Sequence, residues 1–334
     1  MMEERILLAH GNGGRFMREL IAELFARHLA NPVLDTDADA VPLPAIDGEI
    51  MVTTDGFTVQ PLEFPGGNLG SLAVHGVVND LCVAGAVPRY ATLSAIIEEG
   101  LEIATLDRLV ASFARAAAES GMQVVAGDTK VVPRGEGGGL YLAVAAIGVR
   151  TTRQRLGMKR IAPGDQVLVS GPVGDHGIAV MLAREQFGLS GEVCSDSASV
   201  LPLARAVWDL AGLRFMRDPT RGGLATVAHE IARGAGCTVT LQQSQIPVRD
   251  TVASVCEMLG YDPYYLACEG RIVAVASPEA VAPLLASWRG LPGGEAAARI
   301  GRVVAGKSRV ILETPLGGRR ILEELEDDPL PRIC

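Results

Sequence analysis

The sequence predicts an α+β protein that consists of two mixed domains of helices and strands. Its 334 residues are enough for about two domains. Hydrophobic residues make up 48% of the chain and charged residues 21%, which is typical of a globular protein. Only 4% are aromatic, so small aliphatic side chains and 39 glycines fill the interior, as suits an enzyme of alternating helices and strands.

The first half of the chain alternates between helical and strand patterns. Residues 15–29 place Phe16, Leu20 and Leu24 on one helical face, and Asn31-Pro32 ends that helix. We expect further helices over 72–86 and 101–121 and strands over 49–57, 122–132 and 139–150. The polar, turn-rich stretch from 150 to 165 then marks a domain boundary.

The second half repeats this alternation. We expect strands over 166–171, 237–243, 271–277 and 309–313, helices near 176–187, 199–211 and 280–288, and a loop that feeds a helix over 216–236. The predicted divisions are a glycine-rich loop and helix (1–34), an N-terminal domain (35–152), a C-terminal α/β domain (153–315) and a tail (316–334). Prolines and acidic residues predict that the end of the tail is extended, near polyproline II.

Charge and composition exclude several classes. The net charge is −9 and no run of Lys or Arg occurs, which argues against nucleic-acid binding. The N-terminus lacks the pattern of a signal peptide, and no apolar run reaches about 18 residues, so we expect a cytoplasmic protein. Six cysteines occur without a CxxC pair, which argues against a structural zinc site and a disulfide framework.

The cysteine in "PLPRIC", Cys334, is the one that does not fit the role of a small buried hydrophobic residue. Prenylation requires a cysteine four residues from the end, so this thiol is not a lipid site. The terminal thiol is therefore expected to have a different, functional role.

Five aspartates stand at the ends of predicted elements. They are Asp37, Asp55, Asp80, Asp128 and Asp218. Carboxylates that converge from element ends can hold Mg²⁺, which prefers oxygen ligands. The alternative for each is a helix cap or a solvated turn, positions that Asp also favours.

Two glycine-containing segments are candidates for phosphate binding. "HGNGGR" (10–15) leads into a helix, so its backbone N–H groups can approach an anion, although it is not a Walker A loop. "RGG" (221–223) places Arg221 where a phosphate could receive a bidentate contact. A tight turn before a helix is the alternative for the first segment.

Lys130 and Glu269 are the remaining candidates for chemistry. Lys130 lies in an apolar strand pattern, where it could neutralise a transferring phosphoryl group or could simply extend its amine to solvent. Glu269 stands beside apolar residues, where it could act as a base, pair with Arg271 or occupy a turn.

Several motifs occur in the order found in one ATP-binding superfamily. They are "TTDG", "NLGSLAVHG", "VVNDLCVAGAVP", "GDTKVV" and "DPTRGG". In this order they resemble the aminoimidazole ribonucleotide synthetase and selenophosphate synthetase superfamily. Together with "AHGNGG", "FPGGN", "GDHG", "CEGR" and "PRIC", the chain resembles the HypE family of hydrogenase maturation factors from residue 9 to residue 334.

This resemblance implies a homodimer whose N-terminal domains pair their sheets into a barrel-like core with outer helices. It implies that ATP binds near this interface beneath the N-terminal glycine loop. The implied contacts to ATP are His10, Gly11, Asn12, Gly13, Gly14, Asn79, Lys130 and Arg221, and the implied Mg²⁺ ligands are Asp37 (or Asp39), Asp55, Asp80, Asp128 and Asp218.

The implied reaction is ATP-dependent dehydration of an S-carbamoylated Cys334 to a thiocyanate, which supplies cyanide to the iron of [NiFe]-hydrogenase. Glu269 would be the base and Lys130 would stabilise charge on the oxygen. The implied partners are the carbamoyltransferase HypF as donor and the HypC–HypD complex as cyanide acceptor. Alternatives are a small-molecule kinase or synthetase of the same superfamily, a non-catalytic docking scaffold, and a metal-delivery thiol.

Overall fold

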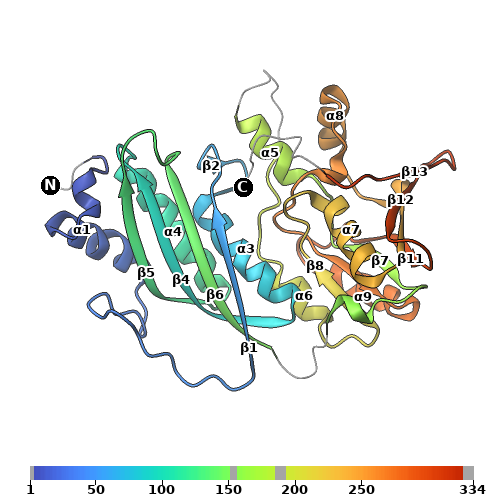
Figure 1. The fold of residues 1–334 in the computed structure, drawn as a ribbon, viewed down its shortest axis with the longest axis horizontal. Helices are drawn as coiled ribbons and strands as arrows, with labels where there is room; N and C mark the ends of the chain where they lie inside the picture. Colours follow the sequence, from blue (N-terminus) through green and yellow to red (C-terminus); the bar gives the residue numbers. More distant parts are fainter. Residues whose placement is uncertain (1–3, 151–155, 185–192, 326–334) are drawn as a thin grey trace. The chain divides into compact units, whose positions relative to one another are not determined.

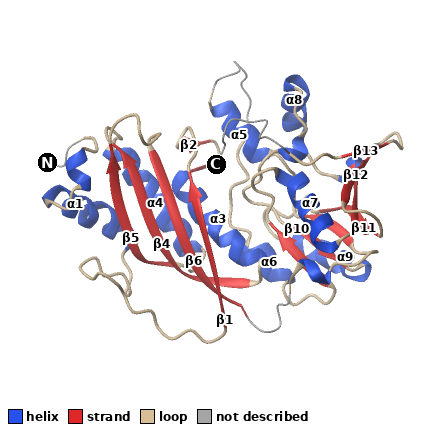
Figure 2. Cartoon of the chain, viewed as in Figure 1, coloured by secondary structure: helices blue, strands red, loops and turns tan. Residues whose placement is uncertain are grey.

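The computed structural model describes residues 4–150, 156–184 and 193–325. The chain forms two compact units. The N-terminal unit comprises residues 1–63, 67–81 and 86–150, and the C-terminal unit comprises residues 64–66, 82–85 and 151–334. Each unit contains a main sheet and helices (Figures 1 and 2), which confirms the predicted α+β class.

A four-stranded sheet forms the N-terminal unit. Its strand order is β1 (Glu49–Phe57), β6 (Leu140–Arg150), β4 (Ala86–Glu98) and β5 (Gln123–Val132). Strands β4 and β5 run parallel, and the other two pairs are antiparallel. Residues alternate in burial along β6, with Leu142, Val144 and Ala146 buried and their neighbours facing the other side. A separate two-stranded sheet pairs β2 (Glu63–Phe64) with β3 (Gly67–Asn68).

Helices cover one face of this sheet (Figure 1). Helix α3 (Leu69–Val83) is almost wholly buried, and α4 (Ile103–Glu119) buries the stripe that includes Leu106, Leu109 and Phe113. The helical segment before the sheet comprises α1 (Arg15–Leu20), a π-helical stretch (Ile21–Ala26) and α2 (Arg27–Leu29). The opposite face of the sheet exposes large apolar side chains, including Ile50, Val52, Ile96 and Tyr141.

A seven-stranded sheet forms the C-terminal unit. Its strand order is β13 (Arg319–Ile321), β12 (Arg309–Glu313), β9 (Thr238–Gln242), β11 (Ala298–Val304), β7 (Gln166–Val169), β10 (Val273–Ala276) and β8 (Leu213–Arg217). Its helices are α5 (Asp175–Ala183), α6 (Leu201–Val207), α7 (Gly223–Ala235), α8 (Asp250–Leu259) and α9 (Val281–Arg289). Leu224 and Ile231 of α7 share one buried core with Val239 and Val310 of the sheet.

Several elements differ from the sequence prediction. The sequence did not predict strands β2, β3, β4, β8, β11 and β13 or helix α8; β8 includes the start of the expected loop at 216, and β13 lies in the expected tail. Leu93, Ala95 and Ile97 nevertheless alternate with exposed residues in β4. Pro88 lies where the pairing of β4 with β6 shifts register, and its presence hides the strand pattern.

The cysteines largely follow the prediction. Among the described residues, Cys82, Cys237, Cys256 and Cys268 are buried and all are free thiols. Cys194 is also free but exposed, so the expectation of burial is wrong for it. In the part of the chain that the structure describes, no helix has the length and apolar character needed to cross a membrane.

Candidate active site

The N-terminal glycine loop packs directly on strand β5. It begins in a short 3₁₀ helix (Leu8–Gly11) in which the buried His10 accepts a hydrogen bond at Nδ1 from the Leu7 N–H, 3.0 Å away. A Cβ on Gly11 would stand 2.8 Å from the backbone nitrogen of Val131, so only glycine permits this approach. The loop therefore lies beside the neighbour of Lys130.

Asp55 and Asp80 lie on the side of the sheet that the helices cover. Asp80 belongs to α3, and its Oδ2 accepts a hydrogen bond of 2.7 Å from Thr53 Oγ1 of β1. Asp55 stands two residues after Thr53, so it points to the same face of β1. Asn79, the neighbour of Asp80, is buried in α3. These two carboxylates therefore belong to the α3 side of the first strand.

Asp128 and Lys130 belong to strand β5, and their side chains face the side of the sheet that the helices do not cover. Both side chains are exposed, and they pair in register with Ser94 and Ile96 of β4. Between them, Thr129 is buried and turned to the helix side, and its Oγ1 has no hydrogen-bond partner among the described residues. A buried hydroxyl without a partner is costly, which indicates that a ligand or water completes it.

The register separates Asp55 from Asp128 within one chain. Asp55 pairs with Val144, Val144 pairs with Leu93, and Leu93 pairs with Gly127, the neighbour of Asp128. Strands β1 and β5 are the two outer strands of the sheet, so these residues are about 14 Å apart across it. One ion therefore cannot bind both carboxylates of the same chain.

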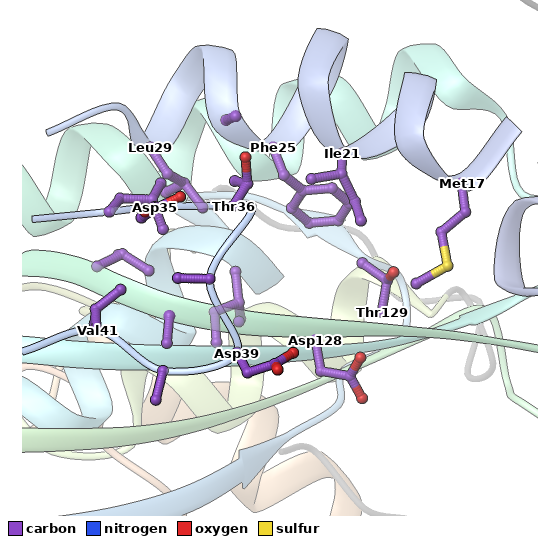
Figure 3. Close-up of a pocket in the computed structure, with 18 residues that line it drawn as sticks. Met17, Ile21, Phe25, Leu29, Asp35, Thr36, Asp39, Val41, Asp128 and Thr129 are labelled. Carbon is purple, nitrogen blue, oxygen red and sulfur yellow. The ribbon is translucent and has the colours of Figure 1, made fainter. Parts of the chain in front are cut away.

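A pocket of about 170 Å³ lies at the β5 edge, under the helical segment 15–29 and the loop 35–41 (Figure 3). Asp39 and Asp128 both line it, and Figure 3 shows their side chains at the same end of the pocket. Thr129 lines it as well. Asp37 is exposed and its N–H donates to Asp35 Oδ1, 2.9 Å away. Of these two aspartates, Asp39 lines the pocket and Asp37 is not among the described residues that line it.

The acidic residues do not form a ready-made metal site. Among the described residues, no three side chains of His, Cys, Asp or Glu are grouped so that they could hold a metal ion. Mg²⁺ is usually bound by one or two carboxylates together with the phosphates of a nucleotide. Asp39 and Asp128, which line the same pocket as the Thr129 hydroxyl, could supply the one or two carboxylates that such a Mg²⁺ ion requires.

In the C-terminal unit, the loop of Asp218 meets the loop of Glu269. The N–H of Cys268 donates to the carbonyl of Pro219 over 3.0 Å, which joins the two loops directly. Asp218 and Glu269 are both buried. Arg221 is exposed in the turn before α7, where Gly222 and Gly223 both have positive φ.

A buried ionic network, which the sequence did not reveal, holds the Glu269 loop. Asp196 Oδ1 accepts a hydrogen bond of 3.1 Å from the N–H of Glu269, and Asp196 pairs with Arg271 at 3.4 Å. Arg271 also pairs with Asp175 at 3.5 Å. Burial raises the pKa of Asp196, and the nearby Arg271 guanidinium opposes that rise.

The network fixes the backbone around Glu269. A Cβ on Gly270 would stand 1.9 Å from the carbonyl oxygen of Asp196, so this turn accepts only glycine. Burial also raises the pKa of Cys268, whose sulfur accepts a hydrogen bond of 3.2 Å from the Gly174 N–H, and both features favour the protonated thiol of a structural residue. Cys334, the candidate substrate thiol, and the predicted extended tail end lie outside the described residues.

Comparisons with known proteins agree with this architecture. Residues 36–150 match the AIR synthase related protein, N-terminal domain, and residues 162–313 match the C-terminal domain of the same family. The fold and these two domains define an AIR synthase-related protein. The chain is 44% identical over 329 residues to the carbamoyl dehydratase HypE of Azotobacter vinelandii, covering 98% of this chain and 96% of that one.

Solved structures give the same relationship. A hydrogenase maturation protein HypE in complex with ATP superposes with a TM-score of 0.93 at 42% identity, covering 98% of this chain and 99% of that one. A chain of a HypE–HypF complex superposes with a TM-score of 0.81 at 39% identity, covering 92% of this chain and 99% of that one. The chain therefore belongs to the HypE family of carbamoyl dehydratases, which confirms the resemblance.

Proposed function

We propose that this chain uses ATP to dehydrate a carbamoyl group on Cys334 to a thiocyanate, and that the product supplies the cyanide ligand of [NiFe]-hydrogenase iron. The observation that carries the proposal is the likeness to a carbamoyl dehydratase over 98% of the chain. A small-molecule kinase of the same superfamily has no use for a terminal thiol. A docking scaffold has no use for the rigid Glu269 loop.

The proposed chemistry converts a poor leaving group into a good one. The carbamoyl oxygen attacks the γ-phosphorus of ATP, ADP leaves, and the nitrogen gives up one proton. The carbon–oxygen bond then breaks as phosphate departs, and loss of the second nitrogen proton completes the nitrile. The oxygen of the carbamoyl group ends in phosphate, so the net change is loss of water from the thiocarbamate, driven by ATP.

Glu269 is the proposed base for the nitrogen protons. Its side chain is only 3% exposed, and hydrogen bonding of its N–H to Asp196 fixes its backbone. A positioned carboxylate in a dry site is a stronger base than one in water. Lys130 is proposed to stabilise negative charge that develops on the transferring oxygen and phosphoryl group.

ATP and Mg²⁺ are the proposed cosubstrate and cofactor. The proposed contacts to the nucleotide are the loop His10–Gly14, Asn79, Lys130 and Arg221. The proposed Mg²⁺ ligands are Asp39 in preference to Asp37, with Asp55, Asp80, Asp128 and Asp218. Mg²⁺, when bound, neutralises charge on the phosphates of ATP.

We further propose a homodimer in which two N-terminal sheets close into a barrel. The exposed apolar side chains Ile50, Val52, Ile96 and Tyr141 support it, because large apolar side chains exposed on one face of a sheet often mark an interface. Outer strands β1 and β5 are available for edge-to-edge pairing. Such pairing would place Asp55 of one chain and Asp128 of the other on adjacent strands, although on opposite faces of the joined sheet.

HypF is the proposed carbamoyl donor, and the HypC–HypD complex is the proposed acceptor of the cyanide. The solved HypE–HypF complex, whose HypE-like chain is 39% identical to this one, supports the first partner. We expect both encounters to take place in the cytoplasm.

The test compares ATP hydrolysis in three variants in the presence of HypF, carbamoyl phosphate and Mg²⁺. Glu269→Gln keeps the backbone contact to Asp196 but removes the base, and it should lower ADP formation by about 10²-fold or more. The exposed Glu257→Gln should retain wild-type turnover. Cys334→Ala should abolish turnover. Turnover that survives Cys334→Ala would establish the kinase alternative, and a complete lack of turnover in wild type would favour the scaffold.

A further inference from the structure

The segment that leaves the last strand, residues 322–325, is held in place by the rest of the C-terminal unit. Leu322 is fully buried in the core, and its N–H donates to the Val310 carbonyl over 3.0 Å. Beyond Leu322, the backbone reaches the surface, because Glu323 and Glu324 are exposed. A short exposed stretch after a buried anchor would ordinarily fray.

Three side chains prevent this fraying. His229 Nε2 donates a hydrogen bond of 2.8 Å to the Leu322 carbonyl, and Tyr265 Oη donates one of 2.7 Å to the Glu323 carbonyl. Arg233 pairs with the Glu324 carboxylate, which lowers the pKa of that carboxyl group. Two of the three contacts are to backbone carbonyls, so they fix the path of the chain itself.

The three contacts come from a compact surface. His229 and Arg233 are one turn apart on α7, and Tyr265 ends the 3₁₀ turn Pro263–Tyr265, which contacts α7. The path leads to the loop of Arg221, because Leu325 Cδ1 lies 3.4 Å from the position of a Cβ on Gly222. Leu325 therefore lies beside the loop that follows Asp218.

We propose that His229, Arg233 and Tyr265 form a tail-root clamp, a set of positioning residues that fixes the point from which Cys334 reaches the reacting groups. This inference rests on the proposed function, in which Cys334 carries the carbamoyl group. Cys334 is the ninth residue after Leu325, so the thiol stays within about 32 Å of the root. Release of residues 323–325 lengthens the free arm and lowers the effective concentration of the thiol.

The experiment uses the full-length protein and the double variant His229→Ala/Tyr265→Phe, with Tyr261→Phe as the matched control. Tyr261 lies near the same turn but makes none of the three contacts. The first readout is hydrogen–deuterium exchange of the amides of residues 322–325, of which the Leu322 N–H donates to the Val310 carbonyl, without donor or ATP. We expect exchange to rise about 2- to 12-fold per hydrogen bond lost, with no change elsewhere and no change in melting temperature.

The second readout is the single-turnover rate of dehydration in protein already carbamoylated by HypF. We expect a decrease of about 1.5-fold or more in the double variant, with an unchanged KM for ATP. Equal exchange in the double variant and the control would overturn the clamp. Faster exchange with an unchanged dehydration rate would overturn its positioning role. Failure of the wild type to lose water would instead defeat the proposed function, whereas the exchange result would stand independently.

Discussion

At the scale of single residues, the candidate site depends on close approaches that leave no room for substitution. Gly270 is the sharpest case, because the backbone carbonyl of Asp196 occupies the space that a side chain would need. The sequence motif "CEGR" pointed to this turn, but the motif does not disclose its partner. Asp196 lies in a polar stretch that is far from this turn in the sequence, and only the fold brings Asp196 and the turn together.

Gly270→Ala should therefore destabilise the C-terminal unit. A methyl group 1.9 Å from a fixed carbonyl oxygen forces the backbone to move, at a cost of about 1–3 kcal/mol. Gly157→Ala is the control, since no atom of the described residues lies within 4 Å of its Cβ position and its backbone is extended. Thermal unfolding of both variants measures the difference. Equal melting temperatures would show that the Glu269 turn is not packed as described.

His75 makes stability depend on pH. Burial in α3 lowers the pKa of this imidazole to about 4. Its unfolded pKa is about 6.5, so the stabilising contribution is fully present above pH 6.5 and is lost as the pH falls toward 4. The free energy of urea unfolding should fall by about 2–3 kcal/mol more in wild type than in His75→Gln between pH 7 and pH 4.5. Parallel pH profiles in the two proteins would contradict this account.

At the scale of elements, the spacing of apolar residues and the positions of turn-forming residues made many segments predictable. The strand over 49–57 and the helical segment over 15–29 have the predicted bounds, because alternation and a helical stripe are local signals. Strand β4 was missed because Pro88 and a register shift interrupt its pattern. The π-helical stretch Ile21–Ala26 was also not predictable, since it changes hydrogen bonding without changing the apolar stripe.

Strand β1 also carries the proposed dimer contact. Val52 is 67% exposed on the uncovered face of the sheet, so Val52→Glu should leave the chain folded but place a charge in the barrel interior. Light scattering after size-exclusion chromatography should then show a monomer. Leu316→Glu is the matched control, because Leu316 is an equally apolar residue that is 99% exposed in the other unit, and this variant should remain a dimer. A dimeric Val52→Glu protein would argue against the barrel interface.

At the scale of the whole molecule, the sequence predicted the α+β class and the family, but not how the candidate ligands are distributed. Motif order identifies a family because each motif is a local string. Convergence of side chains depends instead on strand order, which puts Asp55 and Asp128 on opposite edges of one sheet. Likewise, the pocket that Asp39 and Asp128 line is built from loop, helix and strand, which no local sequence pattern discloses.

The central claim is that Cys334 is the substrate of its own chain. Mass spectrometry of the C-terminal peptide tests it most directly, after carbamoylation by HypF and before and after addition of ATP and Mg²⁺. The account predicts a carbamoyl adduct on Cys334 that loses one water when ATP is added. A carbamoyl adduct that persists unchanged in the presence of ATP and Mg²⁺ would contradict it.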